Sequence, residues 1–556
     1  MLRVLSPRGA LTLHRVDGAL LFAVRAALAM ALVALPVVLA GRPDLAVYAM
    51  LGSFTTTFGR NLPYPRRARV LAVVAAAMTA CVGAGAALAA VARPQEGGAG
   101  AVAVVAATAA VAGLAKFACD RTGLGGLGAV LLLFSFAVAA NGGPASADVL
   151  PRTALAAAGA LVAWLLALLG RLVHPDRPQR LAVASALREL GALLDTADRT
   201  VGPARHRATA AVLQAYYCLG VAPATGGARE DPRSTCVRLA DLSWSLLVGS
   251  ASGAPRDAAG LARRLRRQAD VLADRRRRLP ELPPPVPSAA GSGAVRPAPD
   301  DPTARRAWAL VEGGRGGRHP RSVLLVPALR MALGTAVAGW LAVVLGLGHG
   351  YWAAVSAAAV LHAMNVRTTA QRAVQRTLGT AAGLLPALGV LALHPDPAVL
   401  VLVIVVLEFL LEYTVAGNYG LGVVFLTPLA LLLSDLAAPS PAGTLVHDRG
   451  LAGLLGIGVG LGCALLVVHR RAAVRVERAV AACAEAVERA ERAPADGGGP
   501  PHPVVQMRLA VAVVELREAD DAAMGELWPA GIDPGTVAAL ERRAHLLLAR
   551  RPRSER

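Results

Sequence analysis

The chain has 556 residues, of which 55% are hydrophobic and 17% are charged, and its mean hydropathy is +0.52. Soluble domains carry about 25% charged residues, so this balance excludes an ordinary soluble protein and indicates an integral membrane protein. The formal net charge of +20 fits basic loops on the cytoplasmic side of a membrane together with an arginine-rich cytosolic region. The chain has no basic patch interleaved with aromatic residues, so we expect no nucleic-acid partner.

Six apolar segments precede residue 175. A helix that crosses a bilayer needs ~20 mostly apolar residues. The first segment follows three arginines and is longer than the apolar core of a signal peptide, which has about 7–15 residues, so we interpret it as a retained span. The predicted spans are 20–40, 44–58, 69–92, 99–117, 124–140 and 153–173.

The apolar segments stop at His174, where Arg, Asp and Glu begin to recur every few residues. Apolar residues at helical spacing from Val183 to Leu194 predict a helix that packs on a partner. Beyond a linker rich in Pro and Gly, a second group of six spans is predicted at 323–346, 351–364, 372–393, 397–415, 418–434 and 450–468. The tail that follows has an apolar stripe from Val505 to Leu516, so we expect its helices to pack on the central insert.

The two groups of spans follow one plan. Arg25 and Arg330 open the two first spans, and Arg67 and Arg372 lie in basic hinges, each pair separated by 305 residues. This correspondence predicts a repeated membrane half. The predicted parts are a first membrane half (1–173), a helical cytoplasmic domain (174–279), a linker (280–322), a second membrane half (323–468) and a cytoplasmic helical tail (469–556).

Positive charge alternates between successive loops along both halves. Because Arg and Lys collect on the cytoplasmic side, this alternation predicts twelve spans with both termini in the cytoplasm. Each half then has an even number of spans, so the halves run in the same direction, as parallel repeats. We therefore predict an all-α, multi-pass protein of the plasma (inner) membrane, with two parallel six-span halves and a helical cytoplasmic domain.

Three stretches of the second half carry a family resemblance: GYWAAVSAAAVLHAM, TTAQRAVQRTLGTAAG and NYGLGVVFLTPLALLL, within residues 328–468. The first-half stretch FGRNLPYPRRARVLAVV matches the same pattern. These segments resemble the fusaric acid resistance family of aromatic acid exporter-like membrane proteins. The resemblance implies six spans, a large cytoplasmic domain and six more spans. It also implies outward transport of aromatic or other organic acids and drug-like compounds.

Ionisable residues inside a membrane are the first candidates for function, because an unpaired charge is costly there. Glu408 and Glu412 are four residues apart and share a helical face. Two carboxylates on one face repel each other when both are charged, which suits a proton relay. The alternative is that Glu412 lies near the cytoplasmic end of its span and only reaches water.

Two arginines and two aromatic residues are weaker candidates for the site. Arg25 and Arg330 lie where a guanidinium could attract an anionic carboxylate, or where it would only anchor the span at the interface. Tyr351 and Trp352 lie where an aromatic belt is expected, and stacking on an aromatic substrate is the functional alternative.

The segment from Asn418 to Pro428 combines polar residues, glycines and a proline. Interrupted helices at membrane depth are tolerated where they line a cavity or pack in protein. Asn418, Tyr419 and Thr427 are therefore candidates to face a substrate path, and an ordinary kinked helix is the alternative.

The chain lacks Walker A, HEXXH and GxSxG patterns, and its six cysteines form no CxxC pair. We therefore expect no enzyme activity, no cofactor and no metal site. The expected function is proton-coupled efflux, with the lipid bilayer and small organic anions or aromatic compounds as partners and a homo-oligomer left open. The alternative is a membrane scaffold or channel-like protein that recruits a cytoplasmic or envelope partner.

Overall fold

The computed structural model confirms the all-α class. Over the residues that it describes, regular structure consists of helices, without a β-strand. These residues run from 18 to 548, with gaps at 61, 125–127, 144, 197–200, 221–231, 251–256, 275–305, 307–308, 311–320, 364, 467–469, 493–502 and 526–532. Most of the predicted linker at 280–322 lies outside the described residues.

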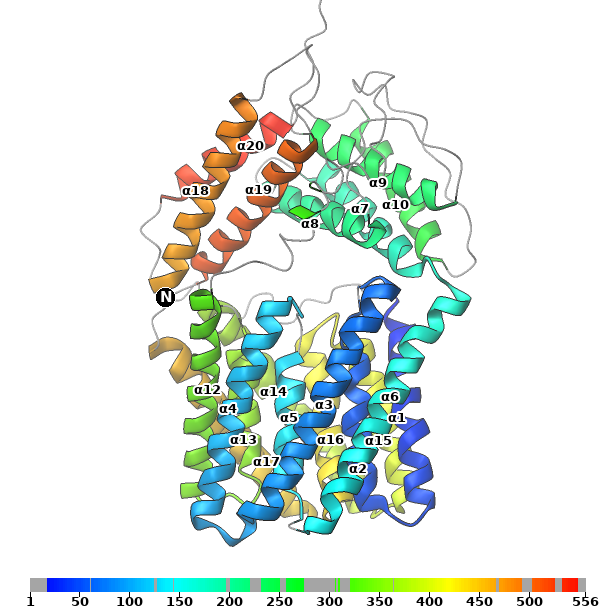
Figure 1. Ribbon diagram of the computed structural model, residues 1–556, viewed down its shortest axis with the longest axis vertical. Helices are drawn as coiled ribbons and strands as arrows, with labels where there is room; N and C mark the ends of the chain where they lie inside the picture. The colour runs from blue at the N-terminus through cyan, green and yellow to red at the C-terminus, as the bar shows by residue number, and fades with distance from the viewer. Residues whose placement is uncertain are drawn as a thin grey trace, which may run out of the picture.

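One layer of the molecule is a bundle of roughly parallel and antiparallel helices, which we call the membrane bundle (Figure 1). Each predicted span coincides with one of its helices. They are α1 (Ala19–Leu39), α2 (Pro43–Ser53), α3 (Tyr64–Ala92), α4 (Gly98–Thr122), α5 (Gly128–Ala140), α6 (Val149–Val173), α12 (Arg321–Val344), α13 (Tyr351–Leu361), α14 (Val366–Ala392), α15 (Pro397–Thr414), α16 (Tyr419–Ala437) and α17 (Ala442–Leu466).

Fewer helices are candidates to cross a membrane than the twelve full spans that were predicted. Eight candidate spans among the described residues are long and apolar enough to cross a membrane. The helices α2 and α13 have 11 residues each, and α5 has 13. At a rise of about 1.5 Å per residue, 11 residues cover roughly half of a hydrocarbon core of about 30 Å. Helices of this length are too short to cross the hydrocarbon core by themselves.

The helices of the bundle pack in matching pairs. In the first set α1 packs on α2, α2 and α3 pack on α6, and α3 and α4 pack on α5. In the second set α12 packs on α13, α13 and α14 pack on α17, and α14 and α15 pack on α16. The two sets meet where α1 packs on α15 and α4 on α12. We propose that the sets are parallel repeats, and this shared pairing order supports the proposal.

Glycines allow the second and sixth helices of each set to approach backbone to backbone. A Cβ atom at Gly159 of α6 would lie 2.0 Å from the carbonyl oxygen of Ala49 in α2. In the second set, a Cβ atom at Gly456 of α17 would lie 2.2 Å from the carbonyl oxygen of Ala353 in α13. Small residues give membrane helices this close packing, which other side chains would prevent.

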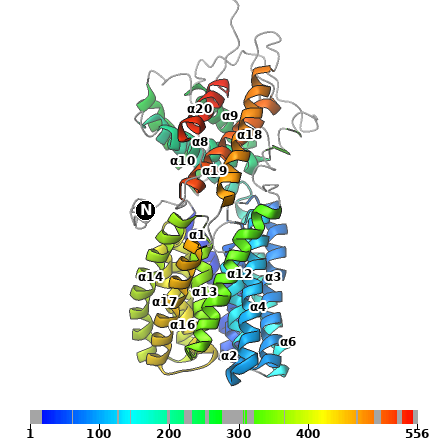
Figure 2. The ribbon, with the colours of Figure 1, turned by 90° about the vertical axis from the view of Figure 1, so that its left-hand side faces the viewer.

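A second layer, which we call the helical domain, lies at one end of the membrane bundle (Figures 1 and 2). One hydrophobic core joins helices of the central insert to helices of the tail. Val183, Leu187 and Leu190 of the predicted apolar stripe are buried in it. The helices are α7 (Arg177–Leu194), α8 (Val201–Leu219), α9 (Pro232–Gly249), α10 (Ala258–Ala273), α18 (Arg470–Arg492), α19 (Pro503–Met524) and α20 (Pro534–Leu548).

The helical domain contacts both basic hinges of the membrane bundle. At the first hinge, the guanidinium of Arg66 lies 4.7 Å from the ring centre of Tyr217 in α8. At the second hinge, the backbone N–H of Arg367 donates to the carbonyl oxygen of Gly525, 2.9 Å away. The domain boundaries predicted from composition remain a proposal, and these contacts support a domain that spans both helix sets.

His545 makes the stability of the helical domain depend on pH. Its Nδ1 donates to the carbonyl oxygen of Glu541 at 2.8 Å, while Nε2 is buried without a partner. Burial lowers the pKa of His545 to about 4. The contribution of His545 to stability is therefore complete above the unfolded pKa of about 6.5 and is lost as the pH falls toward about 4. Between about pH 7.5 and about pH 5, the free energy of unfolding should fall by roughly 2 kcal/mol.

This expectation is checked by thermal unfolding of the purified full chain across that pH range. His545→Phe fills the same space without a titrating group, so it should remove this part of the pH dependence. An unchanged pH dependence in the variant would assign the loss of stability at low pH to other groups.

Candidate functional site

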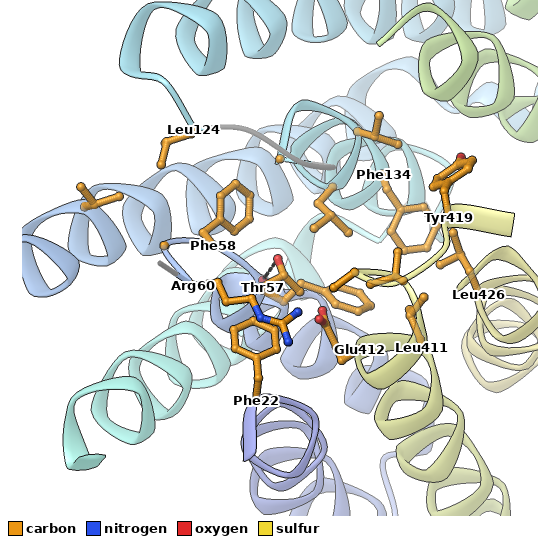
Figure 3. Close-up of a pocket in the computed structure, with 18 of the residues that line it drawn as sticks. Phe22, Thr57, Phe58, Arg60, Leu124, Phe134, Leu411, Glu412, Tyr419 and Leu426 are labelled. Atoms are coloured by element: carbon orange, nitrogen blue, oxygen red, sulfur yellow. Dashed lines mark hydrogen bonds between the residues drawn. The ribbon is translucent and has the colours of Figure 1, made fainter. Parts of the chain in front are cut away.

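A cavity of about 980 Å³ lies between the two helix sets and reaches α8 of the helical domain. Residues of α1, α3 and α5 form one side, and residues of α13 to α17 form the other. Four of the eight phenylalanines of the chain line it. The aromatic lining consists of Phe22, Phe54, Phe58, Phe134, Tyr217, Trp352 and Tyr419 (some of them labelled in Figure 3).

The charged lining of this cavity is strongly one-sided. Among the described residues, six arginines line it, against a single carboxylate, that of Glu412. The arginines are Arg60, Arg66, Arg121, Arg372, Arg376 and Arg449. A cavity with this lining attracts anions, because low-dielectric walls focus the field of like charges.

Two of the arginines are almost fully buried. Arg376 and Arg449 are 2% and 1% exposed. Nη1 of Arg376 donates to the hydroxyl of Tyr419 at 3.1 Å, and Nη2 donates to the hydroxyl of Ser356 at 3.3 Å. The guanidinium of Arg449 lies 4.5 Å from the ring centre of Trp352. Neither guanidinium forms an ion pair with a described carboxylate, although removing such a charge from water is costly.

A second charged group surrounds the carboxylate of Glu412. The guanidinium of Arg60 lies 4.4 Å from the ring centre of Phe22, and that of Arg25 lies 4.7 Å from the same ring. Figure 3 shows Arg60 and Glu412 pointing toward each other beside this ring. Glu408 lies one turn along α15, is 1% exposed, and leaves its Oε2 without a hydrogen-bond partner. At this end of the cavity, the negative charge of Glu412 can thus be compensated by the guanidinium group of Arg60.

The structure brings some of the predicted site residues together at the cavity. Glu412, Tyr419 and Trp352 line it. Arg25 lies behind the lining, against Phe22, and its Nη2 donates to the carbonyl oxygen of Thr56 at 3.4 Å. Of the predicted site residues, one carboxylate, one tyrosine and one tryptophan thus meet in the cavity.

Four other candidates lie outside the lining and have contacts within the bundle. Asn418 caps α16 and accepts a hydrogen bond from the N–H of Leu421 at 3.2 Å. Thr427 is fully buried where α16 meets α14. Arg330 donates to the carbonyl oxygen of Ala363 at 3.2 Å. The hydroxyl of Tyr351 lies 3.0 Å from that of Ser434.

Sequence reasoning missed Arg376 and Arg449 as site residues. It counted Arg376, near the start of the predicted span 372–393, with the basic hinge, and it left Arg449 just outside the span 450–468. The structure begins α14 at Val366, where Asn365 and Thr368 form a capping box, and begins α17 at Ala442. Both arginines are therefore inside helices. A capping box ahead of the apolar run was the signal that could have found the first of them.

No group of three or more His, Cys, Asp or Glu side chains placed to hold a metal ion occurs among the described residues. The lining is instead rich in guanidinium groups and aromatic rings. Chemically, this arrangement can bind an organic anion, by pairing its charge with arginine and its apolar part with aromatic rings.

Comparison with known proteins finds one family model and two relatives that match parts of the chain. Residues 336–463 match the family model described as fusaric acid resistance protein-like. The uncharacterized membrane protein YvaC of Bacillus subtilis (strain 168) is 31% identical over 219 residues, which cover 38% of this chain and 34% of that protein. The uncharacterized protein slr1298 of Synechocystis sp. is 30% identical over 165 residues, which cover 29% of this chain and 21% of that protein.

The matched segments therefore span about a third of one relative and about a fifth of the other. No solved structure matches the chain. The family resemblance found in the second half is confirmed by the family match, which begins within α12 and ends within α17. This chain is thus a multi-pass membrane protein whose second helix set carries a fusaric acid resistance protein-like segment.

Proposed function

We propose that the protein exports aromatic or other organic carboxylates through the cavity between the two helix sets. The observation that carries this proposal is the lining, to which the described part of the chain contributes six arginines, seven aromatic side chains and one carboxylate. Guanidinium groups match the geometry of carboxylates, and aromatic rings pack on the apolar part of such compounds. The cavity volume of about 980 Å³ is at the upper end of the range of small-molecule sites.

Protons are the proposed energy source, with Glu412 as the group that carries them. Its carboxylate lies at the cavity wall, beside the guanidinium of Arg60. A carboxylate that alternates between pairing with arginine and holding a proton would change the net charge of the cavity by one unit. Glu408, one turn away and buried, offers a second proton position on the same helix.

We place the helical domain and both termini in the cytoplasm. The loop arginines of the first hinge are at the end of the bundle that faces this domain, since Arg66 stacks on Tyr217. Basic loops favour the cytoplasmic side, which supports this orientation. In this orientation α8 borders the cytoplasmic entrance of the cavity, through which exported compounds would enter.

Transport is tested with the purified protein in lipid vesicles. The probe is labelled p-aminohippurate, an aromatic carboxylate that crosses bare lipid slowly. We expect saturable uptake into vesicles with an acidic interior, inhibited by benzoate and not by benzamide, its neutral analogue. Uptake no faster than in protein-free vesicles, for either direction of the pH gradient, would contradict transport and favour the scaffold function.

A further inference from the structure

The deep end of the cavity has guanidinium atoms without partners. Nε of Arg376, and Nε and Nη1 of Arg449, are buried and make no hydrogen bond in the structure. They come from α14 and α17, and both residues line the cavity. Two buried cations next to each other are strongly unfavourable without an anion, because burial removes the water that would screen them.

The same guanidinium groups are held in place by neighbouring side chains. Trp352 stacks against Arg449, and the hydroxyls of Tyr419 and Ser356 accept from Arg376. The ring of Trp352 continues into the aromatic wall of the cavity, because its centre lies 5.6 Å from that of Phe134. The unpartnered nitrogens are thus fixed beside an aromatic surface, as a preorganised anion site requires.

The first helix set contains a comparable arginine that forms an ion pair. Arg152 lies near the start of α6, as Arg449 lies near the start of α17, and its guanidinium also lies over a ring, that of Tyr48 at 5.1 Å. Arg152, however, donates to the carbonyl oxygen of Gly143 at 2.7 Å and pairs with Asp148 at 3.3 Å. It does not line the cavity. An arginine over a ring can therefore be paired within the scaffold. Only Nε of Arg152 lacks a partner, whereas Arg449 forms no ion pair with a described carboxylate and leaves both Nε and Nη1 without partners.

We infer that Arg376 and Arg449 form a subsite for the carboxylate of an aromatic monocarboxylate, with the ring of this ligand packed along Trp352 and Phe134. This inference rests on the proposed function and assigns the end of the cavity at which the anionic group binds. The planar guanidinium fork suits a planar carboxylate, and the aromatic wall suits the ring attached to it.

The test compares benzoate with benzamide, which has nearly the same shape without the charge. Binding to the purified full chain is measured by calorimetry for the wild type, Arg449→Gln, Arg376→Gln and the matched control Arg152→Gln. The wild type should prefer benzoate by at least ~10-fold, because losing one partner of a buried charge pair weakens binding by that much or more. Arg449→Gln and Arg376→Gln should each lose the preference, and Arg152→Gln should keep it.

A second measurement separates binding from a structural role. Without ligand, Arg449→Gln should unfold at the same temperature as the wild type or higher, since it removes an unpaired buried charge. Arg152→Gln should unfold at a lower temperature, since it breaks the ion pair with Asp148. If Arg449→Gln instead lost stability as Arg152→Gln does and kept the preference for benzoate, Arg449 would be structural and the subsite would be wrong.

The outcomes also separate this subsite from the transport proposal. If both cavity variants keep the preference while the wild type takes up p-aminohippurate, the subsite is wrong and transport stands. If sodium chloride or sulfate displaces benzoate at equal concentration, the site takes small inorganic anions and the aromatic assignment is wrong. If the wild type neither binds benzoate nor takes up p-aminohippurate, both proposals are wrong. Should Arg449→Gln not fold, Arg376→Gln alone decides the question.

Discussion

Glu412→Gln is expected to abolish proton-driven accumulation of p-aminohippurate in vesicles, while exchange of labelled for unlabelled compound continues. Glutamine has the shape of glutamate but cannot bind and release a proton. Glu412 is the carboxylate among the described residues that line the cavity, next to the guanidinium of Arg60. The loss of accumulation should be roughly 10- to 100-fold, the range of a typical coupling between two binding events.

Two further variants sharpen this test. Glu412→Asp keeps a titrating carboxylate and should retain part of the accumulation. Glu408→Gln should have a smaller effect than Glu412→Gln, because Glu408 is buried behind the lining. Full accumulation in Glu412→Gln would show that the proton is carried elsewhere, and an equal loss of exchange and accumulation would show that Glu412 serves binding and not coupling.

The helices could be predicted from the sequence because their signals are local. Apolar length located every helix of the membrane bundle, and helical spacing found the stripe from Val183 to Leu190 that is buried in the helical domain. The spacing of Glu408 and Glu412 likewise predicted a shared face, and both are buried on α15. Patterns within one helix need no knowledge of the neighbouring helices.

The cavity could not be predicted because it is assembled from distant parts of the chain. Phe22, Phe134 and Tyr217 meet residues of α13 to α17 only after the two sets have packed. Nothing in their local sequence distinguishes these aromatic residues from ordinary core residues. The predicted segment from 408 to 428 does contribute Glu412 and Tyr419 to the lining, whereas the buried cations of α14 and α17 were not among the predicted site residues.

Gly456→Ala is expected to destabilise the membrane bundle by at least about 3 kcal/mol, the upper end of the usual cost of overpacking. The added methyl group would lie 2.2 Å from the carbonyl oxygen of Ala353, so α13 and α17 would have to separate. Gly458 of the same helix is the matched control, because a methyl group there meets no atom within 4 Å. Gly458→Ala should be neutral or stabilising by up to about 1 kcal/mol, as alanine favours helices over glycine.

Unfolding of the two variants in detergent measures the difference, and equal stabilities would contradict the close approach of α13 and α17. The contact also matters for the site. Gly456 follows Arg449 by two helical turns on the same face of α17, and Ala353 follows Trp352 directly. Separating these helices would move the guanidinium of Arg449 away from the ring of Trp352. Any folded Gly456→Ala protein should therefore lose the preference for benzoate over benzamide, whereas Gly458→Ala should keep it.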